Sequence, residues 1–183
     1  MILILSGTNR PGSATRQVAG KIQSLYTQQG ITARVLDLQT LPLDSFSPLA
    51  YAEKPIAFRT FVSPILECHG LVFVTPEYNG SFPGVLKYFI DLLPFPAALE
   101  HKPVSFVGLA DGQWGALRAV EHLQQICLYR NALIHPMRVF IPGIGQVLKS
   151  GNLLPEYGER LKQQAEEFGR FVERHRVTES RPL

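Results

Sequence analysis

The sequence predicts an α/β domain in which five parallel strands form one doubly wound sheet with helices on both faces. Short apolar runs alternate with amphipathic segments along the 183 residues, a pattern typical of repeated strand–helix–strand units. The first run is apolar without interruption, as in strands that are covered on both faces, and the later runs are similar. Right-handed crossovers and the small number of strands favour the strand order 2-1-3-4-5.

The expected strands are the apolar runs along the chain. The first, "ILIL" at residues 2–5, contains no polar residue, and "TARVLDL" at residues 32–38 is the second. Three later runs have the same character. The five strands are therefore expected at residues 2–5, 32–38, 71–75, 104–110 and 133–141.

Apolar residues at helical spacing predict a helix after each strand. The first helix begins near Ser13 and stops before Gly30, which can adopt the left-handed conformation that ends a helix. The last helix has Glu156 in its first turn and Arg170 and Arg174 near its end, as the helix dipole favours. The apolar stripes or ranges are Val18, Ile22 and Leu25; Phe58, Phe61, Val62 and Ile65; 83–92; 116–128; and Tyr157, Leu161, Ala165, Phe168 and Val172.

Length and composition indicate one domain that spans residues 1–183. The chain is 45% hydrophobic, enough for one packed core, and it is too short for two ordinary domains. Its apolar runs are too short to cross a bilayer. The N-terminus "MILILSGTNR" lacks the basic start and long apolar stretch of a signal peptide. We therefore expect a soluble, cytoplasmic protein without a membrane partner.

Metal and nucleic acid are not expected as ligands. Cys68 and Cys127 do not form a disulfide framework, and the 5 histidines include no pair at zinc-ligand spacing. The formal net charge of +3 suits an anionic ligand. The basic residues are scattered, apart from "RFVERHR" near the C-terminus, and show no aromatic interleaving, so nucleic acid is a weak alternative.

The loop "SGTNRPGSATRQ" at residues 6–17 resembles a phosphate-binding loop. In doubly wound sheets, ligands bind beyond the carboxyl ends of the strands, where the winding reverses. Thr8, Ser13 and Thr15 supply hydroxyl groups there, Arg10 supplies charged donors, and the following helix directs its free N–H groups at the same place. The alternative is that Ser13 only caps the helix. The combination of hydroxyls and arginine favours phosphate binding.

Known nucleotide motifs do not match this loop. The Lys-Ser/Thr pair of a Walker A loop is missing, and no acidic residue is clearly placed for magnesium. The glycine spacing in "GTNRPG" also differs from the dinucleotide fingerprint, and the G-x-G from Gly143 to Gly145 lacks the third glycine. A terminal monophosphate fits the loop better than a pyrophosphate.

The loop after the third expected strand, "TPEYNGSFPG", has the composition of a stiff arch. Pro76 removes a backbone donor, Gly80 gives freedom of direction, and a second proline preorganises the next helix. Glu77, Tyr78 and Asn79 are then presented on a rigid loop whose N–H groups can hold a planar polar ring. The alternative is an ordinary Asn-Gly turn in which Tyr78 packs on a neighbour.

The loop after the fourth expected strand, "ADGQWGAL", adds two glycines and an indole. Trp114 is either a cofactor platform at this loop or an anchor in the core or in an interface, which is the more common role of tryptophan. Arg10, Arg16 and Lys87 are candidates to meet an NADPH phosphate, with ordinary surface charge as the alternative.

Four stretches together resemble the NADPH-dependent FMN reductase family of flavodoxin-like proteins, which includes FMN-containing quinone, azo-dye and chromate reductases. The resemblance covers nearly the whole chain, and the arch is its most specific part. It departs in the loop "ADGQWGAL", where the family usually has two adjacent glycines and this chain has Trp114-Gly115 preceded by Asp111. The stretches are "ILSGTNRPGSATRQVA", "VFVTPEYNGSFPGVLKYFID", "KPVSFVGLADGQWGALRAVEHLQ" and "HPMRVFIP".

The resemblance implies a cofactor site for FMN, with NADPH or NADH as hydride donor and a quinone or similar small acceptor. The hydride chemistry belongs to the flavin, so no catalytic acid–base residue is expected. The implied phosphate contacts are Thr8, Arg10, Ser13 and Thr15; the implied ring contacts are Pro76, Glu77, Tyr78, Asn79 and Gly80; and Gly112, Gln113 and Gly115, with Trp114, would line the other side.

Two other functions are weighed against this NAD(P)H oxidoreductase. The first is an FMN electron carrier of the flavodoxin type, against which the basic charge balance argues, because such carriers tend to be acidic. The second is a scaffold that has lost its cofactor, which the retained Arg10, Ser13 and "PEYN" disfavour. We also expect a homodimer or homotetramer, because a planar ring at one end of so small a domain would otherwise stay partly open to water.

Overall fold

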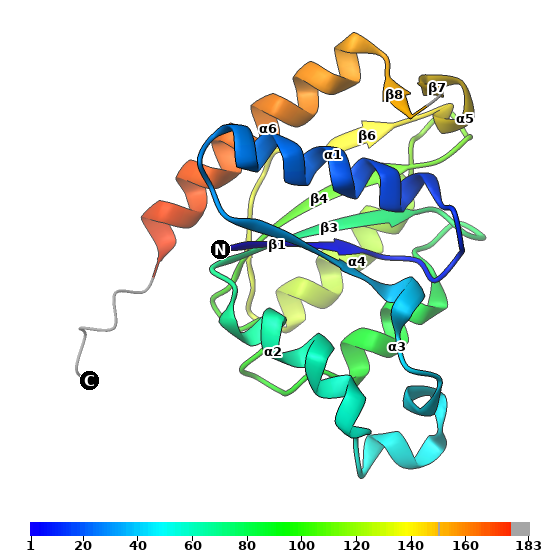
Figure 1. Cartoon of the computed structure of the whole chain (residues 1–183), viewed down its shortest axis with the longest axis vertical. Helices are drawn as coiled ribbons and strands as arrows, with labels where there is room; N and C mark the ends of the chain where they lie inside the picture. Colours follow the sequence, from blue (N-terminus) through cyan, green and yellow to red (C-terminus); the bar gives the residue numbers. More distant parts are fainter. Residues whose placement is uncertain (150, 177–183) are drawn as a thin grey trace.

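The computed structural model describes residues 1–149 and 151–176, and its centre is a parallel sheet (Figure 1). The strands are β1 (Ile2–Ser6), β2 (Ala33–Asp37), β3 (Gly70–Pro76), β4 (Pro103–Leu109), β5 (Leu133–Ile134) and β6 (Val139–Ile141). Their order is β2-β1-β3-β4-β5, with β6 also paired to β4. The predicted flavodoxin-like order 2-1-3-4-5 is confirmed.

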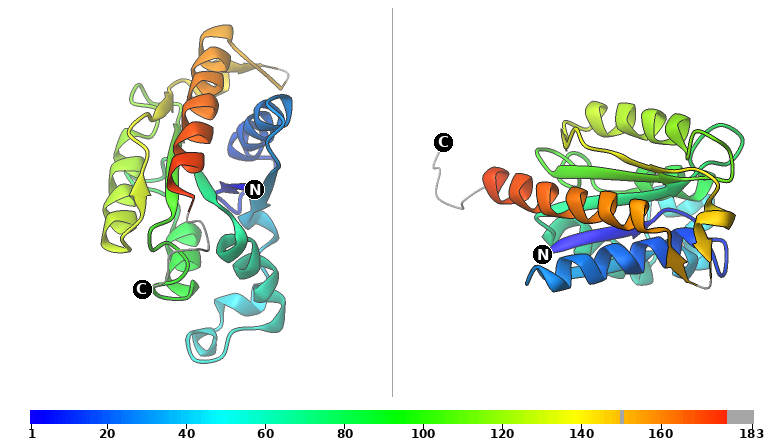
Figure 2. Two further views of the ribbon diagram at one scale, coloured as in Figure 1. Left: turned by 90° about the vertical axis from the view of Figure 1, so that its left-hand side faces the viewer. Right: turned by 90° about the horizontal axis from the view of Figure 1, so that it is seen from above.

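Helices cover both faces of the sheet, as Figure 2 shows from above. Side chains alternate along β1, so that Leu3 and Leu5 face one core while Ile2 and Ile4 face the other. Helices α2, α3 and α4 cover the first core, and α1 and α6 cover the second. None of the helices in the described ranges is both long and apolar enough to span a bilayer. The helices are α1 (Ala14–Gln28), α2 (Arg59–Glu67), α3 (Gly84–Leu92), α4 (Leu117–Tyr129), α5 (Ile144–Val147) and α6 (Pro155–His175).

The first helix begins and ends where the sequence predicts. Ser13 is the N-cap of α1, and its hydroxyl accepts a hydrogen bond from the backbone N–H of Arg16 at 3.2 Å. Gly30 has a φ of +72°, a left-handed conformation that glycine adopts without steric cost. The start of α1 is therefore fixed directly behind the first loop.

The prediction of one continuous fifth strand at residues 133–141 is wrong. The segment forms two short strands, β5 and β6, which pair with successive parts of β4. Pro136 lies between them and has no N–H to donate to the sheet. The side-chain amide of Gln164 on α6 donates instead to the carbonyls of Phe106, at 2.9 Å, and Met137, at 3.1 Å. This side chain replaces the missing strand pairing.

Two further segments lacked a periodic pattern and were not predicted. Residues 38–58 form the short 3-10 helices η1 (Leu38–Thr40), η2 (Leu43–Phe46), η3 (Pro48–Tyr51) and η4 (Ile56–Phe58). The hydroxyl of Tyr88 on α3 holds this excursion by donating to the carbonyl of Ser45 at 2.7 Å. After β6, the chain forms α5 and a small antiparallel pair, β7 (Leu148–Lys149) and β8 (Asn152–Leu153), beyond the carboxyl end of β4 (Figure 1).

Candidate cofactor site

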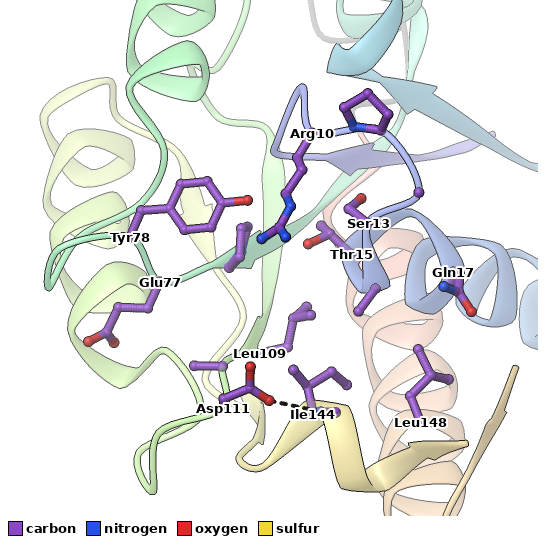
Figure 3. Close-up of a pocket in the computed structure, with 16 residues that line it drawn as sticks. Arg10, Ser13, Thr15, Gln17, Glu77, Tyr78, Leu109, Asp111, Ile144 and Leu148 are labelled. Atoms are coloured by element: carbon purple, nitrogen blue, oxygen red, sulfur yellow. Dashed lines mark hydrogen bonds between the residues drawn. The ribbon is translucent and has the colours of Figure 1, made fainter. Parts of the chain in front are cut away.

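A pocket of about 390 Å³ lies beyond the carboxyl ends of β1, β3 and β4 (Figure 3). It opens where β1 pairs with β2 on one side and β3 on the other, which is the point where the winding of the sheet reverses. Its size is that of a small-molecule site. The lining residues are Arg10, Pro11, Gly12, Ser13, Ala14, Thr15 and Gln17; Pro76, Glu77 and Tyr78; Leu109, Ala110 and Asp111; and Ile144, Gly145 and Leu148.

One wall of the pocket is built only from hydrogen-bond donors and neutral groups. The guanidinium of Arg10 and the hydroxyls of Ser13 and Thr15 lie close together in Figure 3. The backbone N–H groups of the first turn of α1, at Ala14 and Thr15, have no acceptor within the helix. No carboxylate in the described ranges lies within 4 Å of the Arg10 guanidinium. This donor set suits a phosphate dianion.

Thr8 lies behind this wall and not in the pocket lining. The residue is fully buried, and its hydroxyl lies 3.1 Å from the hydroxyl of Tyr78. The same oxygen accepts the backbone N–H of Arg10 at 3.3 Å. Thr8 therefore connects the first loop to the arch, and a direct contact with a phosphate stays a prediction.

The arch after β3 is closed by a tight Asn-Gly turn. Tyr78 and Ser81 exchange two backbone hydrogen bonds, of 2.7 and 3.1 Å. Asn79 and Gly80 between them have φ angles of +51° and +76°, which only a turn of the I′ type combines. Asn79 is exposed, and neither turn residue lines the pocket. The sequence offered a stiff arch and an ordinary Asn-Gly turn as alternatives, and the structure shows an arch that is closed by such a turn.

Contacts with α4 hold the arch from outside. In Figure 3 the carboxylate of Glu77 points away from Arg10 and Ser13. Its Oε1 lies 3.7 Å from Nη1 of Arg118, and its Oε2 is buried without a hydrogen bond in the described residues. The hydroxyl of Ser81 in the arch is hydrogen-bonded to Nδ1 of His122 on α4, at 3.0 Å. The carboxylate of Glu77 therefore faces α4 and not the donor wall around Arg10.

The loop after β4 turns away from the pocket at the glycines. Gly112, Gln113 and Trp114 are exposed, and none of them lines the pocket. Gly115 is buried with a φ of +55°, and a Cβ there would lie 2.7 Å from the backbone nitrogen of Ile141. Only glycine fits this close approach. Trp114 is 54% exposed, so a role as a core anchor is wrong.

Several lining residues were missed by sequence reasoning. Asp111 directly precedes Gly112, which was predicted as a ring contact while Asp111 was not. The others, Ile144, Gly145 and Leu148, follow β6. The carboxyl-end rule also applies to the last strand, so the loop after residue 141 could have been found by the same reasoning. Two candidate NADPH contacts form ion pairs, Arg16 with Asp37 at 3.5 Å and Lys87 with Asp91 at 2.7 Å, and neither lines the pocket. Their contact with NADPH stays a prediction.

The groups with shifted pKa values lie away from the pocket. Burial raises the pKa of the Cys127 thiol to about 12 and also raises the pKa of Tyr26. Burial lowers the pKa of His135. None of these side chains lines the pocket, so the shifts are consequences of packing. The described residues also contain no cluster of three His, Cys, Asp or Glu side chains suited to a metal ion.

Comparison with known proteins identifies the family. The model of the NADPH-dependent FMN reductase family matches residues 1–145. The chain belongs to this family. The match covers the phosphate loop, the arch and the loop after β4, which together form most of the pocket. As a member of the NADPH-dependent FMN reductase family, the chain is an oxidoreductase that uses FMN and NAD(P)H.

Relatives of this FMN reductase include enzymes named for quinones. It is 32% identical to a 2-hydroxy-1,4-benzoquinone reductase from Burkholderia sp, over 73% of each chain. It is 30% identical to a quinone reductase from Escherichia coli K12, over 96% of its own length and 97% of the relative. The flavoenzyme FerB from Paracoccus denitrificans, an NAD(P)H:(acceptor) oxidoreductase, has the same fold, with a TM-score of 0.80, 22% identity and coverage of 95% and 97%.

Proposed function

We propose that the protein transfers hydride from NAD(P)H through bound FMN to a quinone or a similar small acceptor. The observation that carries the proposal is the position of the pocket. It lies at the switch point of a flavodoxin-like sheet, with an anion-binding wall at the start of α1 and a stiff arch opposite. The relatives named quinone reductases support the acceptor class.

The residues that line the pocket fit FMN at both ends. The donor wall of Arg10, Ser13 and Thr15 would hold the phosphate, with Thr8 positioning this wall from behind. The isoalloxazine ring would lie against the arch. Of the contacts predicted at the ring, Pro76, Glu77 and Tyr78 line the pocket. The other predicted contacts do not line it, and their contact with the ring stays a prediction: Asn79, Gly80, Gly112, Gln113, Trp114 and Gly115.

The protein contributes binding and orientation to this reaction. FMN supplies hydride acceptance and donation when it is bound. Arg10 and the N-terminus of α1 would hold and neutralise the phosphate, while the Thr8–Tyr78 hydrogen bond keeps the two loops in register. The contact of Glu77 with Arg118 keeps the arch against α4. NAD(P)H and acceptor would use the same open side in turn, which is a ping-pong cycle.

The test is an absorbance measurement on purified protein. Flavin bands in the protein, bleached within seconds by anaerobic NADPH and restored by a small quinone, are the expected result. Bound flavin that NADPH bleaches slowly or not at all would overturn the proposal and favour an electron carrier. Protein that binds no FMN on titration would favour a scaffold without cofactor.

We also propose that the protein is a homodimer or homotetramer. Tyr78 is 37% exposed and Trp114 is 54% exposed, and both are aromatic side chains near the pocket that a second subunit could cover. Phe82, the third aromatic side chain suited to such a contact, is half-buried and packs against the core. Light scattering at micromolar concentration should report twice or four times the mass of 20.4 kDa. A monomer with full reductase activity would contradict this expectation.

A cytoplasmic location is part of the proposal, with small molecules and not nucleic acid as partners. Cys68 and Cys127 are both free and buried, which suits a reducing compartment. Fractionation of cells should find the reductase activity with the cytoplasmic enzymes. A gel-shift assay should find no binding of nucleic acid at physiological salt.

A further inference from the structure

Asp111 places a carboxylate on the wall of the pocket opposite the phosphate loop. Its Oδ1 accepts a hydrogen bond from the backbone N–H of Gly145 at 2.9 Å. In Figure 3 the other oxygen is directed into the pocket. No hydrogen bond to this second oxygen occurs within residues 1–149 and 151–176. One oxygen is thus engaged in the fold, and the other is available to a ligand.

The carboxylate is held in place by a network between the ends of β4 and β6. Ala110 donates its N–H to the carbonyl of Ile141, and Ile144 donates to the carbonyl of Ala110, both at 3.1 Å. At Gly145 a Cβ would lie 3.1 Å from Oδ1 of Asp111, so glycine permits the close approach. The side chain is therefore oriented before any ligand binds.

The position of Asp111 defines which part of a flavin it would meet. Figure 3 shows Arg10, Ser13 and Thr15 along one side of the pocket, Tyr78 at one end, and Asp111 on the opposite side. In FMN, a polyhydroxylated ribityl chain joins the ring to the phosphate. An ionised carboxylate is an acceptor only, so it attracts hydroxyl donors and repels a phosphate.

From these contacts we propose that Asp111 binds hydroxyl groups of the ribityl chain and makes the pocket selective for flavins that carry this chain. The inference rests on the proposed FMN site, and it adds a residue that the family resemblance does not supply, because the chain departs from the family pattern in this loop. Carboxylates bind sugar hydroxyls in the same way in dinucleotide-binding folds.

If Asp111 only capped α5, one of its two carboxylate oxygens would be sufficient. Capping the first turn of α5 requires one acceptor oxygen, which the amide oxygen of asparagine supplies equally well. Asp111→Asn therefore keeps the bond to Gly145 and removes the charge and one acceptor. This variant separates the capping role from the binding role.

The test compares flavins with and without the ribityl chain. Apo-protein is titrated with riboflavin and with lumiflavin, and binding is followed by flavin fluorescence. Asp111→Asn should weaken riboflavin binding by about 10- to 150-fold, the loss expected for a hydrogen bond to a charged acceptor, while lumiflavin binding is unchanged. Thermal melts of both proteins should coincide, which shows that the fold is intact. The variant Asp111→Ser, whose hydroxyl also accepts from a backbone N–H, is the substitute if the asparagine variant does not fold.

The remaining outcomes overturn the inference. Equal weakening of both flavins would place Asp111 at the ring, and no change for riboflavin would leave it as a cap only. Arg10→Ala, titrated with FMN in parallel, tests the site itself, because loss of the phosphate contact weakens FMN and not riboflavin. An unchanged FMN affinity in Arg10→Ala would reject the proposed site, independently of the result at Asp111.

Discussion

The phenolic oxygen of Tyr78 lies 3.1 Å from the hydroxyl of Thr8, and this hydrogen bond joins the arch after β3 to the loop after β1. Thr8 in turn accepts the backbone N–H of Arg10. The two loops come from neighbouring strands at the switch point of the sheet. The ends of the pocket that are proposed for ring and phosphate therefore share one hydrogen-bond network.

Tyr78→Phe should loosen this network without unfolding the protein. The buried hydroxyl of Thr8 loses its side-chain partner, which costs about 1 kcal/mol of stability, a typical value for one hydrogen bond. We expect FMN affinity to fall several-fold because the loops are no longer fixed relative to each other. Urea unfolding and FMN titration measure the two effects. Tyr129→Phe, at a residue that is 78% exposed on α4, is the control; equal FMN affinity in the two variants would contradict the prediction.

Arg10→Ala should weaken FMN binding by about 1.5–3 kcal/mol, because the charged hydrogen bond to the phosphate is lost. Riboflavin, which has no phosphate, should bind the variant as it binds the parent protein. The matched control is Arg16→Ala, since Arg16 pairs with Asp37 and does not line the pocket. Similar losses in both variants would indicate a general effect of charge and not a contact at Arg10.

The fold and the first loop were predictable because local signals and global rules agree there. Ser13 caps α1 and Gly30 ends it, as the residue types indicate. The apolar run at residues 2–5 predicted a strand that is covered on both faces, and the crossover rule with the small number of strands favoured the observed order. For these elements each residue's preference points to the structure that forms.

The far wall of the pocket was not predictable to the same degree. The break between β5 and β6 depends on a long-range contact, in which Gln164 replaces strand pairing. Pro136 signalled the break, but the apolar residues around it suggested one strand. The contact between Asp111 and Gly145 depends on where β6 ends. Because the last strand was predicted as one continuous strand, the wall that these two residues form was not predicted either.

Protein stability should decrease as the pH falls below about 6.5, in part because of His135. His135 is 4% exposed and packs against the rings of Phe168 and Phe171, with centroid distances of 5.6 and 5.2 Å. Burial lowers the pKa of its imidazole in the folded state. The unfolded chain then binds a proton that the folded chain does not, so this contribution is complete above the unfolded pKa and is lost as the pH falls toward the folded one.

Urea unfolding between about pH 7 and about pH 5 measures this dependence, and His135→Asn should reduce its slope. The slope should not vanish, because the pKa of His69 is also lowered, by burial and by the nearby charge of the Met1 ammonium group. His101→Asn, at an exposed position, is the control for removal of an imidazole elsewhere in the chain. A parent-like slope in His135→Asn would show that His135 does not contribute.

Trp114 should affect which acceptors react more than how stable the protein is. The indole is 54% exposed, so Trp114→Gly removes less buried surface than truncation of a core tryptophan, and the free energy of unfolding should fall by about 1–2 kcal/mol. A core anchor of this size would cost about 3–5 kcal/mol instead. The first measurement is therefore a denaturant melt of the variant beside the parent protein.

If the indole of Trp114 overhangs the open side of the pocket, its removal widens the space for flat acceptors. We expect the KM for a large quinone to fall more than that for a small one in Trp114→Gly, while the rate of flavin reduction by NADPH stays close to the parent value. Trp114→Phe, which keeps an aromatic ring, should give an intermediate acceptor preference. Parallel double-reciprocal lines are expected in all of these proteins because NADPH and quinone share one site in turn. Unchanged acceptor preference in Trp114→Gly would remove the gating role, and intersecting lines would reject the ping-pong cycle itself.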